Sequence, residues 1–439
     1  MNPLHEASAL YTRRQFFGRS AMGIGTAALA SLLGRDAWGA IRPGRKPVPG
    51  LPALPHFAPK AKRVIYLFQN GAPSHVDLFD YKPKLREWHG RQIPDEVVGG
   101  KRFSTMTGNQ TARPVLGEIT KFAQHGRSGA WVSELFPHTA GIVDDITIAK
   151  SCQATLFNHA PAKLFMNTGS GQFGRPSMGS WISYGLGSEC QDLPGFVVLQ
   201  SGPRGPRGGA VNWGSGFLPT THQGVPFRGT GEPILNLTTP KGVAPERQRE
   251  AIDAIRDLNL RRAVDTGDPE ILTRVAAYEM ASRMQTSGPE LIDLSKESPA
   301  TLKLYGVEPG KPSFARNCLL ARRLVERGVR FIQLYHRDWD HHGSLPEQLP
   351  QIARDVDQPS AALVRDLKQR GLLEDTLVIW GGEFGRTPYA QGDANRERYG
   401  RDHHGKAFSI WMAGAGIKPG TTYGASDDFG FNVAADPVH

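Results

Sequence analysis

The sequence predicts an α/β fold in which a mostly parallel central sheet is covered by helices on both faces. Short apolar runs of strand type alternate with longer segments of helical type over most of the 439 residues, an order typical of a parallel sheet with two helical layers. A chain of this length can bury a large core, and a composition of 39% hydrophobic and 21% charged residues is that of a globular protein. We therefore expect a three-layer sandwich.

The first forty residues carry a targeting pattern. A twin-arginine sequence at residues 12–17 precedes a short apolar stretch at 21–33, and residues 37–40 resemble a small-residue cleavage site. The apolar stretch is too short to span a bilayer. We expect a twin-arginine signal peptide at 1–39 and a Pro-rich linker at 40–60. The mature protein would then lie in the periplasm or outside the cell, with no transmembrane span after signal removal.

The expected strands and helices follow from local patterns along residues 61–439. The run 63–68 is a buried-strand candidate that stops at a Gly/Pro turn. Further strands are expected at 142–149, 193–199, 329–335, 377–380 and 408–412, and helices are expected up to residue 166 and at 246–284, 314–326 and 351–369. Residues 201–300 read as an excursion, because a Gly/Pro/Arg-rich loop at 201–239 precedes charged helical sequence.

The charge distribution and the cysteine content argue against a nucleic-acid-binding protein and against a disulfide-rich protein. The formal charge of +10 comes from scattered Lys and Arg without interleaved aromatic residues, so we expect no nucleic-acid partner and a general attraction to anions. Three cysteines, Cys152, Cys190 and Cys318, are too few and too scattered for a disulfide framework.

Carboxylates and imidazoles gather where the predicted strands end. Ligands of open α/β sheets bind at the carboxyl ends of the strands, so these groups are candidates for one divalent metal site. Imidazole suits Zn and carboxylate suits harder ions, which leaves Zn, Ca, Mn or Mg open. The plainer alternative is that these residues only cap loops or form surface ion pairs. The candidate metal ligands are Asp340, His342, Glu383, His403, Asp338, His75 and Asp77.

Four separated motifs resemble the DUF1501 family, a group of exported bacterial proteins related to sulfatases. They are the segment 68–83, Trp339-Asp340-x-His342, the segment 382–388 and the segment 400–403. The likeness covers residues 61–439 and implies the three-layer, alkaline-phosphatase-like sandwich of the alkaline phosphatase superfamily, whose members hydrolyse phosphate or sulfate esters at one or two metals. The family continues beyond the Asp-Pro-Val-His segment that ends this chain, so we expect a truncated C-terminus.

The resemblance also implies roles for particular residues. Thr155 would be the nucleophile and Asn158 a contact to a non-bridging oxygen, whereas His159 is expected to be structural. Either Asp338 or Asp340 could pair with His342 as a ligand, and either His403 or His404 could be the last imidazole. Two departures from the superfamily pattern stand out: Gln69-Asn70 replaces the first-strand Asp, and Phe384 replaces a paired His. From its own chemistry, Arg386 is a suitable fork for a sulfate or phosphate group.

These observations predict an exported, metal-dependent hydrolase of sulfate or phosphate esters, with sulfated polysaccharide as one candidate substrate. The partner would be an anionic ester or a sulfated glycan, and the oligomeric state is not predicted. The alternative is a catalytically degenerate relative that binds a glycan or a protein.

Overall fold

The computed structural model describes residues 50–51, 58–100, 103–104, 106–202, 205–228, 234, 243–394 and 398–439. The expected signal peptide and most of the expected linker lie outside these residues. The chain divides into two compact units, one of residues 50–238 with 283–439 and one that includes residues 239–282. Within the described ranges, no helix combines the length and apolarity that crossing a membrane requires.

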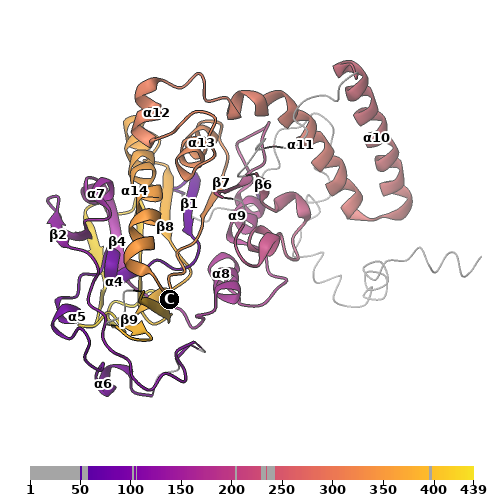
Figure 1. The fold of residues 1–439 in the computed structure, drawn as a ribbon. Helices are drawn as coiled ribbons and strands as arrows, with labels where there is room; N and C mark the ends of the chain where they lie inside the picture. The colour runs from indigo at the N-terminus through magenta and orange to yellow at the C-terminus, as the bar shows by residue number, and fades with distance from the viewer. Residues whose placement is uncertain are drawn as a thin grey trace, which may run out of the picture. The chain divides into compact units, whose positions relative to one another are not determined.

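A mixed sheet forms the centre of the larger unit (Figure 1). In the described part of the chain, its strands follow the order β12 (Thr421–Tyr423), β4 (Ile146–Cys152), β11 (Phe408–Ala413), β8 (Thr376–Gly381), β1 (Arg63–Gln69), β7 (Phe331–His336), β5 (Phe196–Gln200) and β6 (Val225–Phe227). Every neighbouring pair is parallel except those of β11, which runs antiparallel to β4 and β8. The predicted α/β class with a mostly parallel sheet is confirmed.

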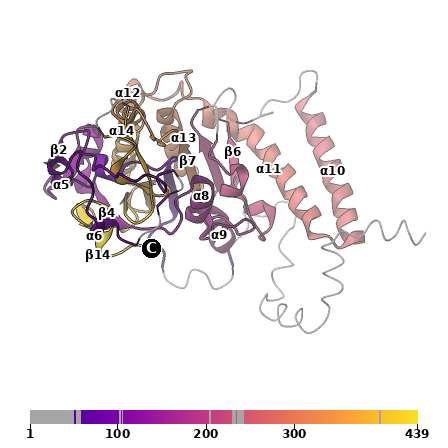
Figure 2. The ribbon, with the colours of Figure 1, turned by 60° about the horizontal axis from the view of Figure 1, so that its bottom comes forward.

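Helices cover both faces because the central strands are apolar on both. On β1, Val64, Tyr66 and Phe68 share a core cluster with residues of α8 (His159–Thr168) and α9 (Met178–Leu186). The alternate residues Ile65 and Leu67 are also fully buried. Figures 1 and 2 show α8 and α9 as one group and α12 (Pro299–Tyr305), α13 (Phe314–Glu326) and α14 (Leu345–Gln369) as another.

Smaller elements complete the larger unit. The hairpin of β9 (Gly385–Gln391) and β10 (Gly400–His404) carries part of the candidate site. The short helices are α4 (His75–Leu78), α5 (Pro83–Glu87), α6 (Asp95–Val98), α7 (Pro137–Ala140), η2 (Val143–Asp145), η3 (Gly209–Trp213) and η4 (Thr220–His222). Two further strand pairs are β2 (Phe122–His125) with β3 (Ala130–Ser133), and β13 (Ala425–Ser426) with β14 (Val433–Ala435). Cys152, Cys190 and Cys318 are buried and unpaired.

The excursion at 201–300 holds more structure than its sequence predicted. Within it lie β6, two 3-10 turns and two long helices, α10 (Pro245–Thr266) and α11 (Pro269–Ile292). The single helical region expected at 246–284 is divided at Gly267, which caps α10 with a left-handed φ of +65°. The expected strand at 142–149 begins only at residue 146, because residues 143–145 form η2.

A buried ion network joins the segment before α12 to α13. Glu297 accepts one hydrogen bond at 2.6 Å from Arg322 and another at 2.6 Å from Arg323. Burial opposes ionisation of Glu297, but these two hydrogen bonds outweigh it and hold the pKa of the carboxyl below its ordinary value. The charged carboxylate therefore stabilises the folded protein.

Glu297→Gln is expected to lower the free energy of unfolding by about 3 kcal/mol at neutral pH, because it leaves the buried guanidinium of Arg323 without a carboxylate partner. Arg322, in contrast, keeps Glu326 and Asp366. Since the folded pKa lies below the ordinary value of 4.5, the carboxylate's contribution is present above that pH and is lost as the pH falls through the folded pKa. Urea denaturation at neutral pH and near pH 3 measures both effects. Glu308→Gln, which breaks an exposed pair with Lys311, is the control and should cost less than about 1 kcal/mol. A gap between wild type and Glu297→Gln that stays constant with pH would contradict this account.

Candidate metal centre

Four side chains from three parts of the chain meet at the end of the central sheet. His159 is the first residue of α8, Asp340 and His342 follow β7, and His403 lies on β10. One ligand atom from each of the four lies within 4.8 Å of all the others. Asp340, His342 and His403 were predicted from sequence, and the structure brings them together with His159. These four residues are called the metal cluster below.

The interatomic distances in the metal cluster are short. His342 Nε2 lies 2.8 Å from Asp340 Oδ1 and 3.0 Å from His403 Nε2. His403 Nε2 is 3.2 Å from Asp340 Oδ1, and His159 Nε2 is 3.0 Å from Asp340 Oδ2. A tetrahedral zinc site with bonds of about 2.0–2.1 Å sets its ligand atoms roughly 3.3 Å apart. These contacts are slightly shorter than that spacing and all four ligand atoms lie within 4.8 Å of one another, so small shifts of the side chains would admit a single small cation.

Two acceptors outside the metal cluster fix which ring nitrogens face inward. His159 Nδ1 lies 2.7 Å from Glu383 Oε1, and His342 Nδ1 lies 2.5 Å from Gln391 Oε1. Because both oxygens only accept, each Nδ1 carries the proton in the neutral ring, and each Nε2 lone pair faces Asp340. Opposite Asp340, each Nε2 therefore either carries a second proton or shares a cation with the carboxylate, and the shared cation is the arrangement of metal-binding histidines with supporting acceptors.

Glu383 contacts a residue of the metal cluster but is not a member of it. It is fully buried, and Gly71 N donates to both of its oxygens at 3.1 and 3.2 Å. Burial opposes its ionisation, but the hydrogen bond from His159 and the charge of Lys163 lower the pKa of Glu383. A Cβ at Gly71, where φ is +115°, would meet the backbone of the Asp340 loop at 2.8 Å, so only glycine fits between the two segments. Glu383 therefore orients His159 instead of joining the cluster.

The pKa shifts of the cluster describe its charge without a metal. Burial is the main cause that lowers the pKa of His403 to about 4, so this ring is neutral at pH 7. Burial opposes ionisation of Asp340, but hydrogen bonds from His159, His342 and His403 lower the pKa of its carboxyl below the ordinary range. Burial opposes protonation of His159, but its hydrogen bonds with Asp340 and Glu383 outweigh burial and raise the pKa of this ring. A carboxylate with imidazoles is a donor set for a divalent transition metal, and a bound metal would displace the proton from His159 Nε2.

A small cavity of about 80 Å³ opens beside the metal cluster. His159 and Asp340 form part of its lining. Lys163 and Arg207 add two positively charged groups, and Asp338 adds a carboxylate that is paired with Arg337. Lys163 is only 2% exposed, its Nζ lies 3.6 Å from Glu383 Oε1, and burial is the main cause that lowers its pKa. The cavity therefore combines candidate metal ligands with cationic groups suited to an anion.

Three predicted ligands lie outside the metal cluster, because other contacts hold them. Asp338 lines the small cavity beside the cluster, but it is mostly exposed and pairs with Arg337 at 2.9 Å. His75 is buried with its Nε2 2.8 Å from Gly430 O. Asp77 forms a fully buried, two-point ion pair with Arg401, at 2.7 and 3.0 Å. The expectation that Asp338, His75 and Asp77 share the metal is corrected by these contacts.

Asp77→Asn is expected to destabilise the fold by about 3–5 kcal/mol, because it leaves the buried Arg401 guanidinium uncompensated. The metal content of the protein that still folds should not change, since Asp77 lies outside the metal cluster. Chemical denaturation and elemental analysis measure the two quantities. Asp338→Asn, at the other excluded carboxylate, is the matched control and should change the stability by less than about 1 kcal/mol. A lower metal content in either folded variant would place that carboxylate among the ligands.

The residues predicted to act on the ester are also placed differently. Thr155 is exposed and lines a second, larger cavity that His403 shares. Asn158 is exposed at the N-cap of α8, without a side-chain capping bond. Arg386 is 2% exposed, and its guanidinium donates to Ala72 O at 2.9 Å and to Asp340 Oδ1 at 2.8 Å. Arg386 therefore positions Asp340 and is not available as a fork for substrate.

Sequence reasoning missed His159 and Lys163. They stand four residues apart at the start of a helix that follows a strand, and residues at that spacing share one helix face. That spacing was a usable signal. Phe384, noted as a departure, packs against His159 and His403 with ring centroids at 5.1 and 4.8 Å. It therefore forms an apolar wall of the metal cluster.

Comparison with known proteins identifies the family. No curated protein matches the chain. Among solved structures, alkaline phosphatase from the Antarctic bacterium TAB5 is similar at 10% identity and a TM-score of 0.34, over 85% of this chain and 97% of that one. A mutant of that enzyme with Mg bound in its M3 site has 11% identity and a TM-score of 0.36 over the same shares. PsFucS1 sulfatase from Pseudoalteromonas sp. has 14% identity and a TM-score of 0.34, over 88% of this chain and 66% of that one. The DUF1501 family, described as a protein of unknown function, matches residues 61–439, and the chain belongs to this family.

Proposed function

We propose that this protein is an exported hydrolase that uses a divalent metal ion to cleave sulfate or phosphate esters. The observation that carries the proposal is one arrangement: His159 and Asp340 of the metal cluster share a small cavity with the cationic side chains of Lys163 and Arg207. A metal site alone fits many functions, whereas a metal site beside two cationic groups favours an anionic substrate. The twin-arginine pattern at residues 12–17 supports export.

The donor set narrows the choice of metal. Three imidazoles with one carboxylate suit Zn or Mn better than Ca or Mg, which prefer oxygen ligands. Bound there, such an ion supplies a Lewis acid for the charge that develops on an ester oxygen.

The protein's own residues have three tasks in this proposal. Lys163 and Arg207 hold the anionic group of the ester in the small cavity. Glu383 and Gln391 keep the Nε2 atoms of His159 and His342 directed inward. Phe384 covers His159 and His403 and excludes water from that side.

The lining of the small cavity indicates which group attacks the ester. Its lining, within the described residues, contains no Ser, Thr or Cys, and Thr155 belongs to the larger cavity. We therefore propose direct attack by water: its oxygen bonds to the sulfur or phosphorus, the ester bond breaks, and the alcohol leaves with a proton. Thr155→Ala should retain turnover under this proposal, whereas a covalent Thr155 intermediate requires that it be inactive.

The second candidate is a binding protein that takes up a sulfated glycan without cleaving it. It is favoured by Asn70, a neutral residue in the small cavity at a position where the superfamily pattern has an Asp. It is also favoured by Arg386, which is buried against Asp340 and not free for substrate.

The test is turnover of a defined panel by protein purified after export. Sulfate and phosphate esters of 4-nitrophenol and of simple sugars are assayed with Zn, Mn, Ca and Mg after chelation. Metal-dependent release of sulfate or phosphate supports the hydrolase. Binding of sulfated sugars with no turnover of any ester under any metal would replace it with the binding protein.

A further inference from the structure

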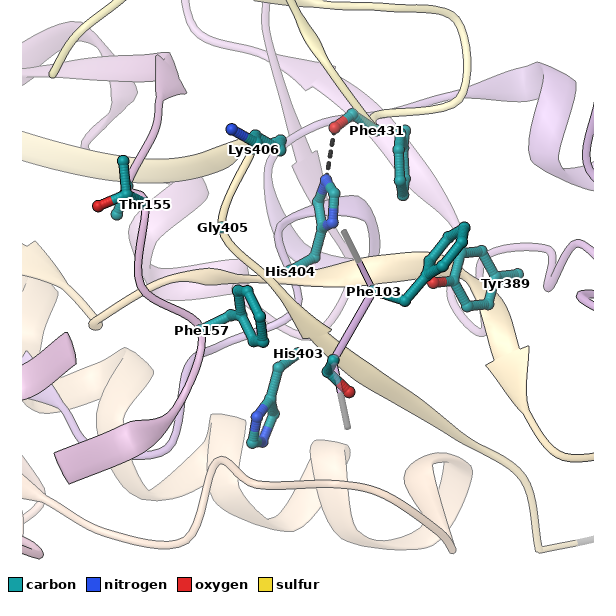
Figure 3. Close-up of a pocket in the computed structure, with 11 residues that line it drawn as sticks. Phe103, Thr155, Phe157, Tyr389, His403, His404, Gly405, Lys406 and Phe431 are labelled. Carbon is teal, nitrogen blue, oxygen red and sulfur yellow. Dashed lines mark hydrogen bonds between the residues drawn. The ribbon is translucent and has the colours of Figure 1, made fainter. Parts of the chain in front are cut away.

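A larger cavity, of about 170 Å³, is lined in part by His403 and takes no part in the proposed hydrolysis. Its walls are mainly aromatic, with a few polar groups at intervals. In the view of Figure 3, Phe157 lies on one side of His404, and Phe103 and Tyr389 lie on the other. The lining residues are Phe103, Ser104, Ala154, Thr155, Phe157, Tyr389, His403, His404, Gly405, Lys406 and Phe431.

Both this cavity and the small cationic one are lined by residues of the metal cluster. His403 lines the larger cavity, whereas His159 and Asp340 line the smaller. The ring centroids of His159 and His403 are 4.3 Å apart, and His403 Nε2 is 3.2 Å from Asp340 Oδ1. The two cavities therefore lie close to the same metal cluster, and the proposed site has the charged group of one ester in the small cavity and its alcohol part in the aromatic one.

The walls of the larger cavity are held in place by buried contacts. Asp402, which is fully buried next to His403, accepts hydrogen bonds from Ser104 and from Thr107, the latter at 2.5 Å. His404 stacks on Phe431 with ring centroids 4.1 Å apart and also bonds to its carbonyl oxygen. A site with fixed walls loses little freedom on binding, as ligand sites require.

We propose that this aromatic cavity binds the pyranose ring of the alcohol part of the substrate. The inference rests on the proposed function, since it assigns the substrate class of the same centre. The cavity has room for one six-membered ring, because a cavity of about 150 Å³ holds one benzene ring. The chemistry favours a sugar over a purely apolar ring. The rings of Phe103, Phe157 and Phe431 offer contact to ring C–H groups, while Thr155 and Lys406 offer partners for hydroxyl groups.

The test measures binding of neutral sugars, so that it does not depend on turnover. Saturation-transfer NMR is recorded with methyl glucopyranosides, galactopyranosides and mannopyranosides, and with phenol as the aromatic competitor. The proteins are wild type, Phe157→Ala, and Phe173→Ala as the matched control. Phe173 is 76% exposed and lines neither cavity. Thr155→Trp, at an exposed position of the lining, fills the cavity and serves as a second variant should Phe157→Ala not fold.

At least one pyranoside is expected to bind wild type and Phe173→Ala alike, and to bind Phe157→Ala or Thr155→Trp about tenfold more weakly. Failure of every pyranoside to bind, binding that neither variant weakens, or binding of phenol alone would each overturn the proposal. Pyranoside binding at this cavity without turnover of any ester supports the sugar site and counts against the hydrolase. Turnover of esters without any pyranoside binding supports the hydrolase and overturns the sugar site.

Discussion

His342→Ala is expected to weaken divalent metal binding by at least about 100-fold. Removing only the hydrogen-bond partner of a metal ligand already costs about 10- to 100-fold, and this substitution removes a ligand itself. His342 Nε2 lies 2.8 Å from Asp340 Oδ1 and 3.0 Å from His403 Nε2, so it contacts two other members of the metal cluster. Its removal leaves three of the four donor atoms. Elemental analysis after dialysis gives the metal content, and competition with a zinc indicator gives the affinity.

The control for this substitution is His341→Ala, at the adjacent position. His341 is also buried, at 3% exposed, but its ring is not part of the metal cluster. The control should keep its metal even where the lost packing lowers its stability. Equal metal content in wild type and His342→Ala would remove the basis for every catalytic account of this site.

Lys163→Met is expected to lower kcat/KM for sulfate or phosphate esters by about 10²-fold, which corresponds to roughly 2.7 kcal/mol of transition-state stabilisation. Lys163 is nearly fully buried in the small cavity, where a positive charge interacts more strongly with an anion than it would in water. Methionine keeps most of the side chain's volume and removes the charge. The metal content should stay at the wild-type level, which separates anion binding from metal binding.

Lys150→Met is the matched control for this second substitution. Lys150 is another largely buried lysine, and burial is also the main cause that lowers its pKa. It lies near Asp80, and neither of the two cavities has it in its lining. Activity should be unchanged in Lys150→Met. If Lys163→Met keeps full activity, or if Lys150→Met loses as much, the cationic cavity is not where the ester binds.

The sequence by itself determined the layers of the fold and the region of the site. Apolar runs such as residues 63–68 and 377–380 became the central strands β1 and β8, because a strand buried on both faces is a local, continuous pattern. Asp340 and His342 follow β7, and His403 lies on β10. Sequence motifs predicted these three residues because the ends of the strands can be located from the local sequence. Turn residues end a strand where the sequence places them.

Only the tertiary structure decided which of several similar residues share the cluster. His159 and Glu383 are 224 residues apart and meet through one hydrogen bond, whereas Asp77, an equally plausible ligand by type, is held by Arg401. The local sequence pattern predicts that a carboxylate or an imidazole lies at the end of a strand. It does not predict the direction in which the following loop turns. That direction depends on contacts between distant segments, such as the close approach of Gly71 to the Asp340 loop, which no periodicity along the chain records.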